Sequence, residues 1–189
     1  VDVGPNRPDL LCHKGIAREL STSYGTPFRL PVIPHTGPIG VPPSRKSGAT
    51  ADAGGIEIVI EDVESCPRFH GALVQGVRVG PSPEWLRRRL ESVGVRSISN
   101  VVDATNWVML ELNQPMHAYD AAKIRGGRLI VRRGLAGERL VTLDEVERAL
   151  TPDMVAIADA EGAIGLGGVM GGAGTDVAMG AAANALRQP

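Results

Sequence analysis

The clearest pattern of apolar and polar positions lies between residues 97 and 120, SISNVVDATNWVMLELNQPMHAYD. The residues of one face recur with the 3.6-residue period of a helix; they are Val101, Val102, Thr105, Val108, Met109 and Leu112. This pattern predicts a helix of about three to four turns in which Val101, Val102, Val108 and Met109 are buried. Ser99 or Asn100 is suited to cap its start, and Asn113-Gln114-Pro115 ends it, because the residue before a proline is pushed into an extended conformation.

Two shorter helices are predicted before this one. Residues 83–93 follow Ser82, a good N-cap, and Gly94 stands just past their end, with Trp85, Leu86, Leu90 and Val93 expected to face inward. Near the N-terminus, Asp9 is the expected N-cap of a helix whose apolar side consists of Leu10, Leu11, Ile16, Ala17 and Leu20.

Six extended segments are predicted, at 56–62, 68–79, 128–133, 138–143, 154–159 and 163–170. Residues 145–150 favour a helix by propensity, but they also fit the second arm of a hairpin. A hairpin requires a positive φ at Asp144 or Glu145, where a glycine would be easier to accommodate. The residues by themselves leave both alternatives open.

Proline and glycine are concentrated in residues 31–55, with few apolar residues between them, which is typical of a linker. We therefore divide the chain into a small N-terminal domain portion at 1–30, a linker at 31–55 and a main domain at 56–189. The first residue is Val1 and no element closes the C-terminus, so we expect a piece of a longer chain.

The composition is that of a globular protein, with 189 residues, 43% of them hydrophobic and 22% charged. No apolar run approaches 18 residues and no signal peptide is evident, so we expect a cytoplasmic protein without a membrane segment. The two cysteines and four histidines lack metal-ligand spacing, so no metal site is expected. Residues 84–133 carry nine basic and five acidic side chains, whereas 134–189 carry three and eight; either an RNA-binding side or ordinary solvated surfaces would explain this.

Two further features carry candidate chemistry. His117 lies on a turned segment after the central helix, where a histidine is either structural or a ligand-binding group. Residues 165–172, GLGGVMGG, lack the third glycine of G-x-G-x-x-G and any Gly-Lys-Ser/Thr, which argues against a phosphate-binding loop. Glycines at a strand end instead indicate close approach of the backbone to another strand or to a ligand.

Residues 97–120 resemble the signature segment of the B3/B4 domain in the beta subunit of bacterial phenylalanyl-tRNA synthetase. The resemblance extends to residues 4–11, 15–20, 67–69, 79–86, 142–144, 150–159 and 167–172. It implies an α+β fold, a three-layer β/β/α sandwich of B3/B4 type that is incomplete at the C-terminus, beside a small helical N-terminal piece. It also implies cytoplasmic partners, namely tRNA(Phe) and an alpha subunit in an α2β2 parent that uses ATP and magnesium. No cofactor is expected in this segment. The family has Leu-Asp-Gly at a hairpin turn where this chain has Leu143-Asp144-Glu145, so the resemblance implies a hairpin there, and we predict the hairpin rather than the helix.

The resemblance further implies that this domain hydrolyses tyrosine wrongly attached to tRNA(Phe). His117 would act as the catalytic residue, by positioning the ester or relaying a proton. The substrate-binding residues would be Thr105, Asn106, Pro115, Gly167, Gly168 and Gly171. We expect His117 to lie within reach of the Gly167 to Gly171 segment and of Thr105 or Asn106, so that all of them form one concave site.

Two positions depart from the family. Arg187 stands where the family has a glutamate that would bind the phenol hydroxyl of tyrosine, and Gly167 replaces a common alanine. The tail after residue 178 does not resemble the family. Two alternatives therefore stay open: an RNA-binding or scaffold module without hydrolytic activity, and a free-standing hydrolase of mischarged tRNA, against which the family-like N-terminal segment argues.

Overall fold

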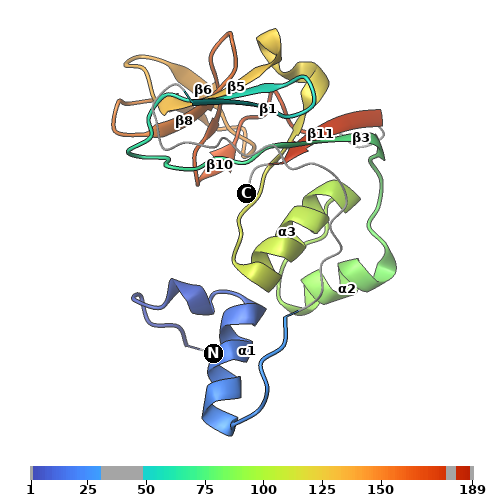
Figure 1. Ribbon diagram of the computed structural model, residues 1–189. Coiled ribbons are helices and arrows are strands. Elements are labelled where there is room, and N and C mark those ends of the chain that lie inside the picture. Colours follow the sequence, from blue (N-terminus) through green and yellow to red (C-terminus); the bar gives the residue numbers. More distant parts are fainter. Residues whose placement is uncertain (1, 31–48, 178–181, 188–189) are drawn as a thin grey trace. The chain divides into compact units, whose positions relative to one another are not determined.

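The computed structural model describes residues 2–30, 49–177 and 182–187. The chain divides into two compact units, each of which is described by itself. The helical unit consists of the described residues within 1–38 and 81–116, and the sheet unit consists of those within 39–80 and 117–189. The predicted α+β class is confirmed (Figure 1).

The helical unit contains the 3-10 turn η1 (Pro8–Leu10) and the helices α1 (His13–Tyr24), α2 (Glu84–Ser92) and α3 (Asn100–Leu112). Helix α3 is the predicted central helix, and its N-cap is Ser99, whose side chain accepts a hydrogen bond from the Val102 N–H at 3.3 Å. It ends at Asn113, which takes the left-handed conformation with φ 59°. Local sequence signals therefore located both ends of α3.

The predicted burial of α3 is wrong in detail. Asp103 and Thr105 are the buried residues of the helix, whereas Val101, Val102, Val108 and Met109 are only half-buried. Helix α3 contacts both α1 and α2, so its contacts are spread around the helix rather than along one apolar stripe. The most enclosed position is filled by the Asp103 carboxylate, which accepts hydrogen bonds from Ser82, Ser97 and the Ile98 N–H.

The predicted caps of α1 and α2 each change. Cys12, not Asp9, is the N-cap of α1, and its sulfur accepts from the Gly15 N–H at 3.3 Å. Asp9 instead accepts from the Arg7 and Arg18 guanidinium groups. The N-cap of α2 is Pro83, because the Ser82 hydroxyl donates to Asp103 at 2.5 Å rather than accepting from the helix.

Several apolar residues expected to face inward are exposed in the helical unit. Leu86 and Leu90 of α2 are buried as predicted, but Trp85 is 55% exposed and Val93 46% exposed. In and beside α1, Leu11 and Leu20 are exposed, and Cys12 and Gly15 are buried in their place. A Cβ on Gly15 would lie 1.8 Å from the Asp9 carbonyl oxygen, so η1 packs directly on the backbone of α1.

The sheet unit is built around a six-stranded sheet with the order β1-β2-β5-β8-β9-β10. These strands are β1 (Ala49–Asp52), β2 (Glu57–Ile60), β5 (Arg128–Arg133), β8 (Val155–Ala158), β9 (Ala163–Leu166) and β10 (Met170–Gly171). Strands β2 and β5 are parallel, and every other pair in this sheet is antiparallel. The main core lies on this sheet; it includes Ile58, Ile60, Leu129, Val131, Ile157 and Tyr119.

Two smaller sheets complete the unit. The first has the order β3-β11-β4 and joins β3 (Ala72–Arg78), β11 (Ala182–Arg187) and β4 (Ala118–Asp120). The second pairs β6 (Arg139–Val141) with β7 (Glu147–Ala149), and the short 3-10 turns η2 (Ala121–Lys123) and η3 (Arg125–Gly127) follow β4. The tail that resembles no family segment thus supplies β11, the central strand of the three-stranded sheet; Figure 1 shows β11 beside β3.

The hairpin prediction is confirmed over the helix alternative, because β6 and β7 pair through a turn in which Glu145 has φ 62°. The linker prediction needs a correction. Its last part contains strand β1, which pairs with β2 through residues such as Thr50 and Val59. The rest of the predicted linker, residues 31–48, lies outside the described residues.

Candidate functional site

His117 directly precedes β4, and its ring packs on the core of the sheet unit. The imidazole makes an edge-to-face contact with Tyr119, with 4.6 Å between ring centroids and 73° between planes. Tyr119 lies two positions after His117 and is only 1% exposed. Its buried ring therefore forms a fixed wall for the imidazole. Successive side chains of an extended segment point to opposite sides, so His117 and Tyr119, two positions apart, place their rings on the same side.

The glycine-rich segment 165–172 lies against these two rings. A Cβ on Gly171 would lie 2.3 Å from both Nε2 and Cε1 of His117, and a Cβ on Gly165 would lie 3.0 Å from the Tyr119 hydroxyl. Real side chains cannot approach that closely, so glycine at 171 is required for the backbone to meet the imidazole. The expected contact between His117 and the Gly167 to Gly171 segment is therefore present at Gly171.

The His117 imidazole has one nitrogen without a partner. Its Nε2 is buried and lacks a hydrogen bond among the described residues. Burial lowers the pKa of the imidazole, and the negative charge of Asp176 partly opposes this change. A neutral ring at pH 7 follows, and a neutral imidazole can accept a hydrogen bond or a proton from a water molecule.

The other predicted glycines serve different local purposes. Gly167 packs against Val155, whose Cγ1 would lie 2.8 Å from an added Cβ, and its N–H already donates to the Val155 carbonyl at 2.8 Å. Gly168 has φ 72° in the turn between β9 and β10 and has open space around it. Among these glycines, Gly171 touches the imidazole and Gly168 supplies the turn.

Thr105, Asn106 and Pro115 belong to the helical unit, whereas His117 belongs to the sheet unit. Thr105 is buried within α3 and its hydroxyl donates to the Val102 carbonyl at 2.6 Å. Asn106 is half-buried, and Pro115 is exposed in the segment after the helix. The local bond of Thr105 is the ordinary one for a helical threonine.

Three residues near His117 were not singled out from the sequence. Tyr119 and Asp176 contribute the ring contact and the charge described above, and the buried Thr175 hydroxyl has no hydrogen-bond partner among the described residues. The Thr175 carbonyl accepts from the Asp120 N–H at 3.0 Å, which ties the segment after the glycines to β4. In the sequence, the only hint of their role is that Thr175 and Asp176 follow shortly after the glycine-rich segment, which is a weak indication of a site.

Arg187, at the position expected to differ from the family, lies on β11. Its backbone pairs with Ala118, the neighbour of His117, while Leu186 pairs with Tyr119. The register therefore places this position beside the histidine segment.

The basic segment between residues 123 and 133 does not present free cations. Each of its five basic side chains is paired with a carboxylate, in the pairs Lys123–Asp176, Arg125–Glu161, Arg128–Glu57, Arg132–Glu138 and Arg133–Asp62. Arg128 and Glu57, for example, lie 2.5 Å apart. The interpretation of the charge pattern as a phosphate-binding side is thus not supported for this segment, and ion-paired surface accounts for it.

Within the parts of the chain that the structure describes, no three His, Cys, Asp or Glu side chains are grouped so that they could hold a metal ion. In the same parts, every helix is too short or too polar to cross a bilayer.

Comparison with known proteins gives consistent results. Residues 65–182 match the B3/4 domain family. The chain is 47% identical over 180 residues to the phenylalanine–tRNA ligase beta subunit of Anaeromyxobacter dehalogenans, covering 95% of this chain and 21% of that protein. It is 44% identical over 177 residues to the beta subunit of Nitratidesulfovibrio vulgaris, with 94% and 21% covered. The chain thus spans about a fifth of the length of these relatives.

A solved structure also shares the fold. It is an N-terminal fragment of the phenylalanyl-tRNA synthetase beta subunit from Pyrococcus horikoshii, with a TM-score of 0.50 and 15% identity over 97% of this chain and 52% of that one. At this identity the likeness concerns the fold alone.

Proposed function

The chain belongs to the B3/4 domain family, and we propose that it is a portion of a phenylalanine–tRNA ligase beta subunit whose B3/4 domain hydrolyses tyrosine wrongly attached to tRNA(Phe). One observation carries the proposal: the buried, unpartnered Nε2 of His117 lies against Gly171, at the position where a hydrolytic histidine is expected. An unpaired buried nitrogen costs free energy, so its retention indicates a role beyond packing.

In this proposal His117 acts on the water that attacks the aminoacyl ester. The Nε2 accepts a proton as the water oxygen bonds to the ester carbonyl carbon, and it returns that proton to the ribose oxygen when the carbon–oxygen bond breaks. Burial lowers the pKa of His117, so the neutral ring required for this step is the form present at pH 7. The products are free tyrosine and an intact tRNA.

The remaining site residues take supporting roles in the proposal. The backbone of the turn at Gly168 is assigned to the developing oxyanion, since the Gly167 N–H is already bonded to Val155. Thr105, Asn106 and Pro115 would bind the amino acid or the terminal adenosine. The parent would assemble with an alpha subunit as α2β2 in the cytoplasm and would use ATP and magnesium to attach phenylalanine, outside this segment.

The test uses the full-length parent with its alpha subunit. His117→Ala should abolish hydrolysis of preformed Tyr-tRNA(Phe) and leave phenylalanine attachment unchanged, because attachment uses a different site. His70→Ala is the matched control, since His70 is a second histidine of the same unit outside this site. Undiminished Tyr-tRNA hydrolysis by His117→Ala would overturn the assignment.

One observation favours a second candidate, an RNA-binding or scaffold module without hydrolysis. Arg187 pairs with Ala118 at the position where the resemblance places a tyrosine-binding glutamate. We accordingly expect little hydrolysis from the 189-residue chain alone. Arg187→Glu in the full-length parent should raise the preference for Tyr-tRNA over Phe-tRNA if the position faces the substrate. An unchanged preference would favour the second candidate.

A further inference from the structure

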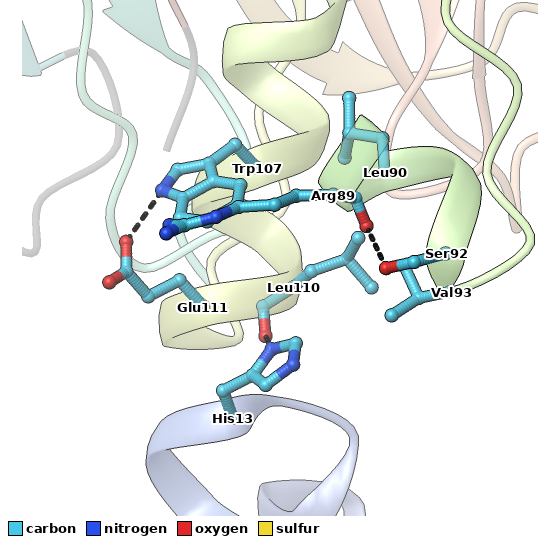
Figure 2. A pocket seen from close by; sticks show the side chains of 8 residues that line it. All are labelled: His13, Arg89, Leu90, Ser92, Val93, Trp107, Leu110 and Glu111. Atoms are coloured by element: carbon cyan, nitrogen blue, oxygen red, sulfur yellow. Dashed lines mark hydrogen bonds between the residues drawn. The ribbon is translucent and has the colours of Figure 1, made fainter. Parts of the chain in front are cut away.

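A hollow of about 360 Å³ lies within the helical unit, between α1, α2 and α3. Figure 2 shows the side chains that line it, with Trp107, Leu110 and Glu111 from α3, Arg89 and Leu90 from α2, and His13 from α1. Its volume is in the range of pockets that hold small organic ligands. None of these residues belongs to the site proposed above.

The Arg89 guanidinium and the Trp107 indole form one wall of the hollow, and Trp85 packs beside them. The Arg89 guanidinium lies over the indole of Trp107 (Figure 2), with Cζ 5.4 Å from the ring centroid. The same Cζ lies 5.8 Å from the ring centroid of Trp85. The two indoles meet edge to face at 5.6 Å. Leu90, Val93 and Leu110 supply apolar surface. Aromatic rings and guanidinium planes are the groups on which nucleic-acid bases stack.

Besides the N–H donors of the Arg89 guanidinium, which lies over Trp107, the hollow has two acceptors at its rim, on Glu111 and His13. One Glu111 oxygen accepts from Trp107 Nε1 at 2.8 Å, which holds the carboxylate at the hollow and leaves its second oxygen without a bond among the described residues. His13 Nδ1 lies 3.0 Å from the Leu110 carbonyl oxygen, and since a carbonyl only accepts, Nδ1 carries the hydrogen. In the neutral ring, Nε2 is then an acceptor. A fitting ligand must be planar and must donate hydrogen bonds.

From this combination we infer that the hollow binds an unpaired nucleobase that carries an exocyclic amino group, that is adenine, cytosine or guanine rather than uracil. The base packs against the Arg89–Trp107 pair and the apolar wall, and its amino group donates to Glu111. Uracil has no amino group, and it would direct a carbonyl oxygen at Glu111 where adenine and cytosine direct their amino groups; guanine carries its amino group on C2 instead. The inference takes from the proposed function only the premise that the chain meets RNA.

The test uses the 189-residue chain and its own fluorescence, because Trp85 and Trp107 are its only two tryptophans. Titration with AMP, CMP or GMP should quench this fluorescence saturably, and UMP should bind roughly tenfold more weakly, since an acceptor at the rim stays unpaired. Calorimetry of the same titrations provides an independent readout. Absence of saturable binding, or equal affinity for all four nucleotides, would overturn the inference.

A substitution that preserves packing tests the role of Glu111. In Glu111→Gln the amide oxygen can still accept from Trp107, but the amide nitrogen turns a donor toward the hollow. The preference for amino-bearing bases should therefore shrink or reverse in favour of UMP, which a purely structural role would not produce. Glu91→Gln, at an exposed residue of α2 that does not line the hollow, should leave the preference unchanged. An unaltered preference in Glu111→Gln would contradict the assignment.

A displacement experiment identifies the source of the base, and a comparison with Tyr-tRNA hydrolysis separates this inference from the proposed function. Displacement of bound AMP by single-stranded oligoadenylate at lower concentration would assign an RNA base, whereas AMP binding that oligoadenylate cannot displace would assign a free nucleotide. Because AMP contains no aminoacyl ester, its binding is independent of hydrolysis at His117. A chain that binds AMP but does not hydrolyse Tyr-tRNA would thus fail only the proposed function.

Discussion

The imidazole of His117 occupies the space that a side chain at Gly171 would need. An added Cβ at position 171 would come within 2.3 Å of Nε2 and Cε1, whereas at Gly174, three residues further on, it would meet nothing within 4 Å. The backbone of the glycine-rich segment and the histidine segment therefore fit together without a side chain between them.

We predict that Gly171→Ala displaces the imidazole and lowers the free energy of unfolding by about 1–3 kcal/mol, the usual cost of overpacking. Urea denaturation of the 189-residue chain measures this change. In the full-length parent the same substitution should impair Tyr-tRNA hydrolysis. Gly174→Ala is the control and should change stability by no more than about 0.5 kcal/mol; equal effects of the two substitutions would contradict the packing shown here.

The Arg132–Glu138 ion pair should contribute more to stability than the other ion pairs of the sheet unit. The two side chains are 12% and 13% exposed, and Glu138 also accepts from the N–H groups of Leu135 and Ala163. Glu138→Gln should cost about 3 kcal/mol in unfolding free energy, because it removes the hydrogen-bonded counter-charge of the largely buried Arg132. Glu147→Gln, which breaks an exposed pair with Arg139, should cost less than about 1 kcal/mol.

The ionisation of Glu138 should also make the unfolding free energy depend on pH. The hydrogen bond from Arg132 lowers the pKa of Glu138 from 4.5 to about 2. Its folded-state pKa lies below its unfolded value, so its contribution to stability is complete above pH 4.5 and is lost as the pH falls toward 2. Urea midpoints measured across this range should fall less steeply for Glu138→Gln than for the unmodified chain. Parallel curves would show that Glu138 is not the titrating group.

Asp103 is predicted to be the most sensitive polar position of the helical unit. It is fully buried, and two serine hydroxyls and one backbone N–H donate to it at 2.5–2.9 Å. Burial opposes ionisation, but these hydrogen bonds prevail and hold the pKa of Asp103 below its usual value. Asp103→Ala should destabilise by about 3 kcal/mol because the donors lose their acceptor. Glu91→Ala on exposed α2 surface should have little effect on the urea midpoint.

Glu145 offers a stabilising substitution. Its φ of 62° lies in the left-handed region, which costs a residue with a side chain about 1–2 kcal/mol. Glu145→Gly should therefore raise the unfolding free energy by about 1 kcal/mol. Glu147→Gly, in strand β7 and without a positive φ, should lower it instead. If thermal unfolding showed that both substitutions change stability in the same direction, a positive φ at Glu145 would be contradicted.

Much of the local structure follows from the sequence by itself. The 3.6-residue period, the Ser99 cap and the Asn113-Gln114-Pro115 stop determine where α3 begins and ends, and the alternation of residues 56–62 determines β2. These signals are short-range, because helix periods, caps and turns depend on residues a few positions apart. The family resemblance likewise came from contiguous residues.

Tertiary structure decided which of these surfaces are covered. Leu11, Trp85 and Val93 are as apolar as Leu86 and Leu90, yet only the last two are buried. The hydrogen bonds that place Asp103 at the centre of the helical unit join residues up to 21 positions apart, and β11 completes a sheet with a strand more than 100 residues earlier. Burial and pairing depend on partners that are distant in sequence, so a pattern along one segment cannot specify them. The contact of His117 with Gly171, 54 residues apart, is of this kind, and only the folded chain brings the two together.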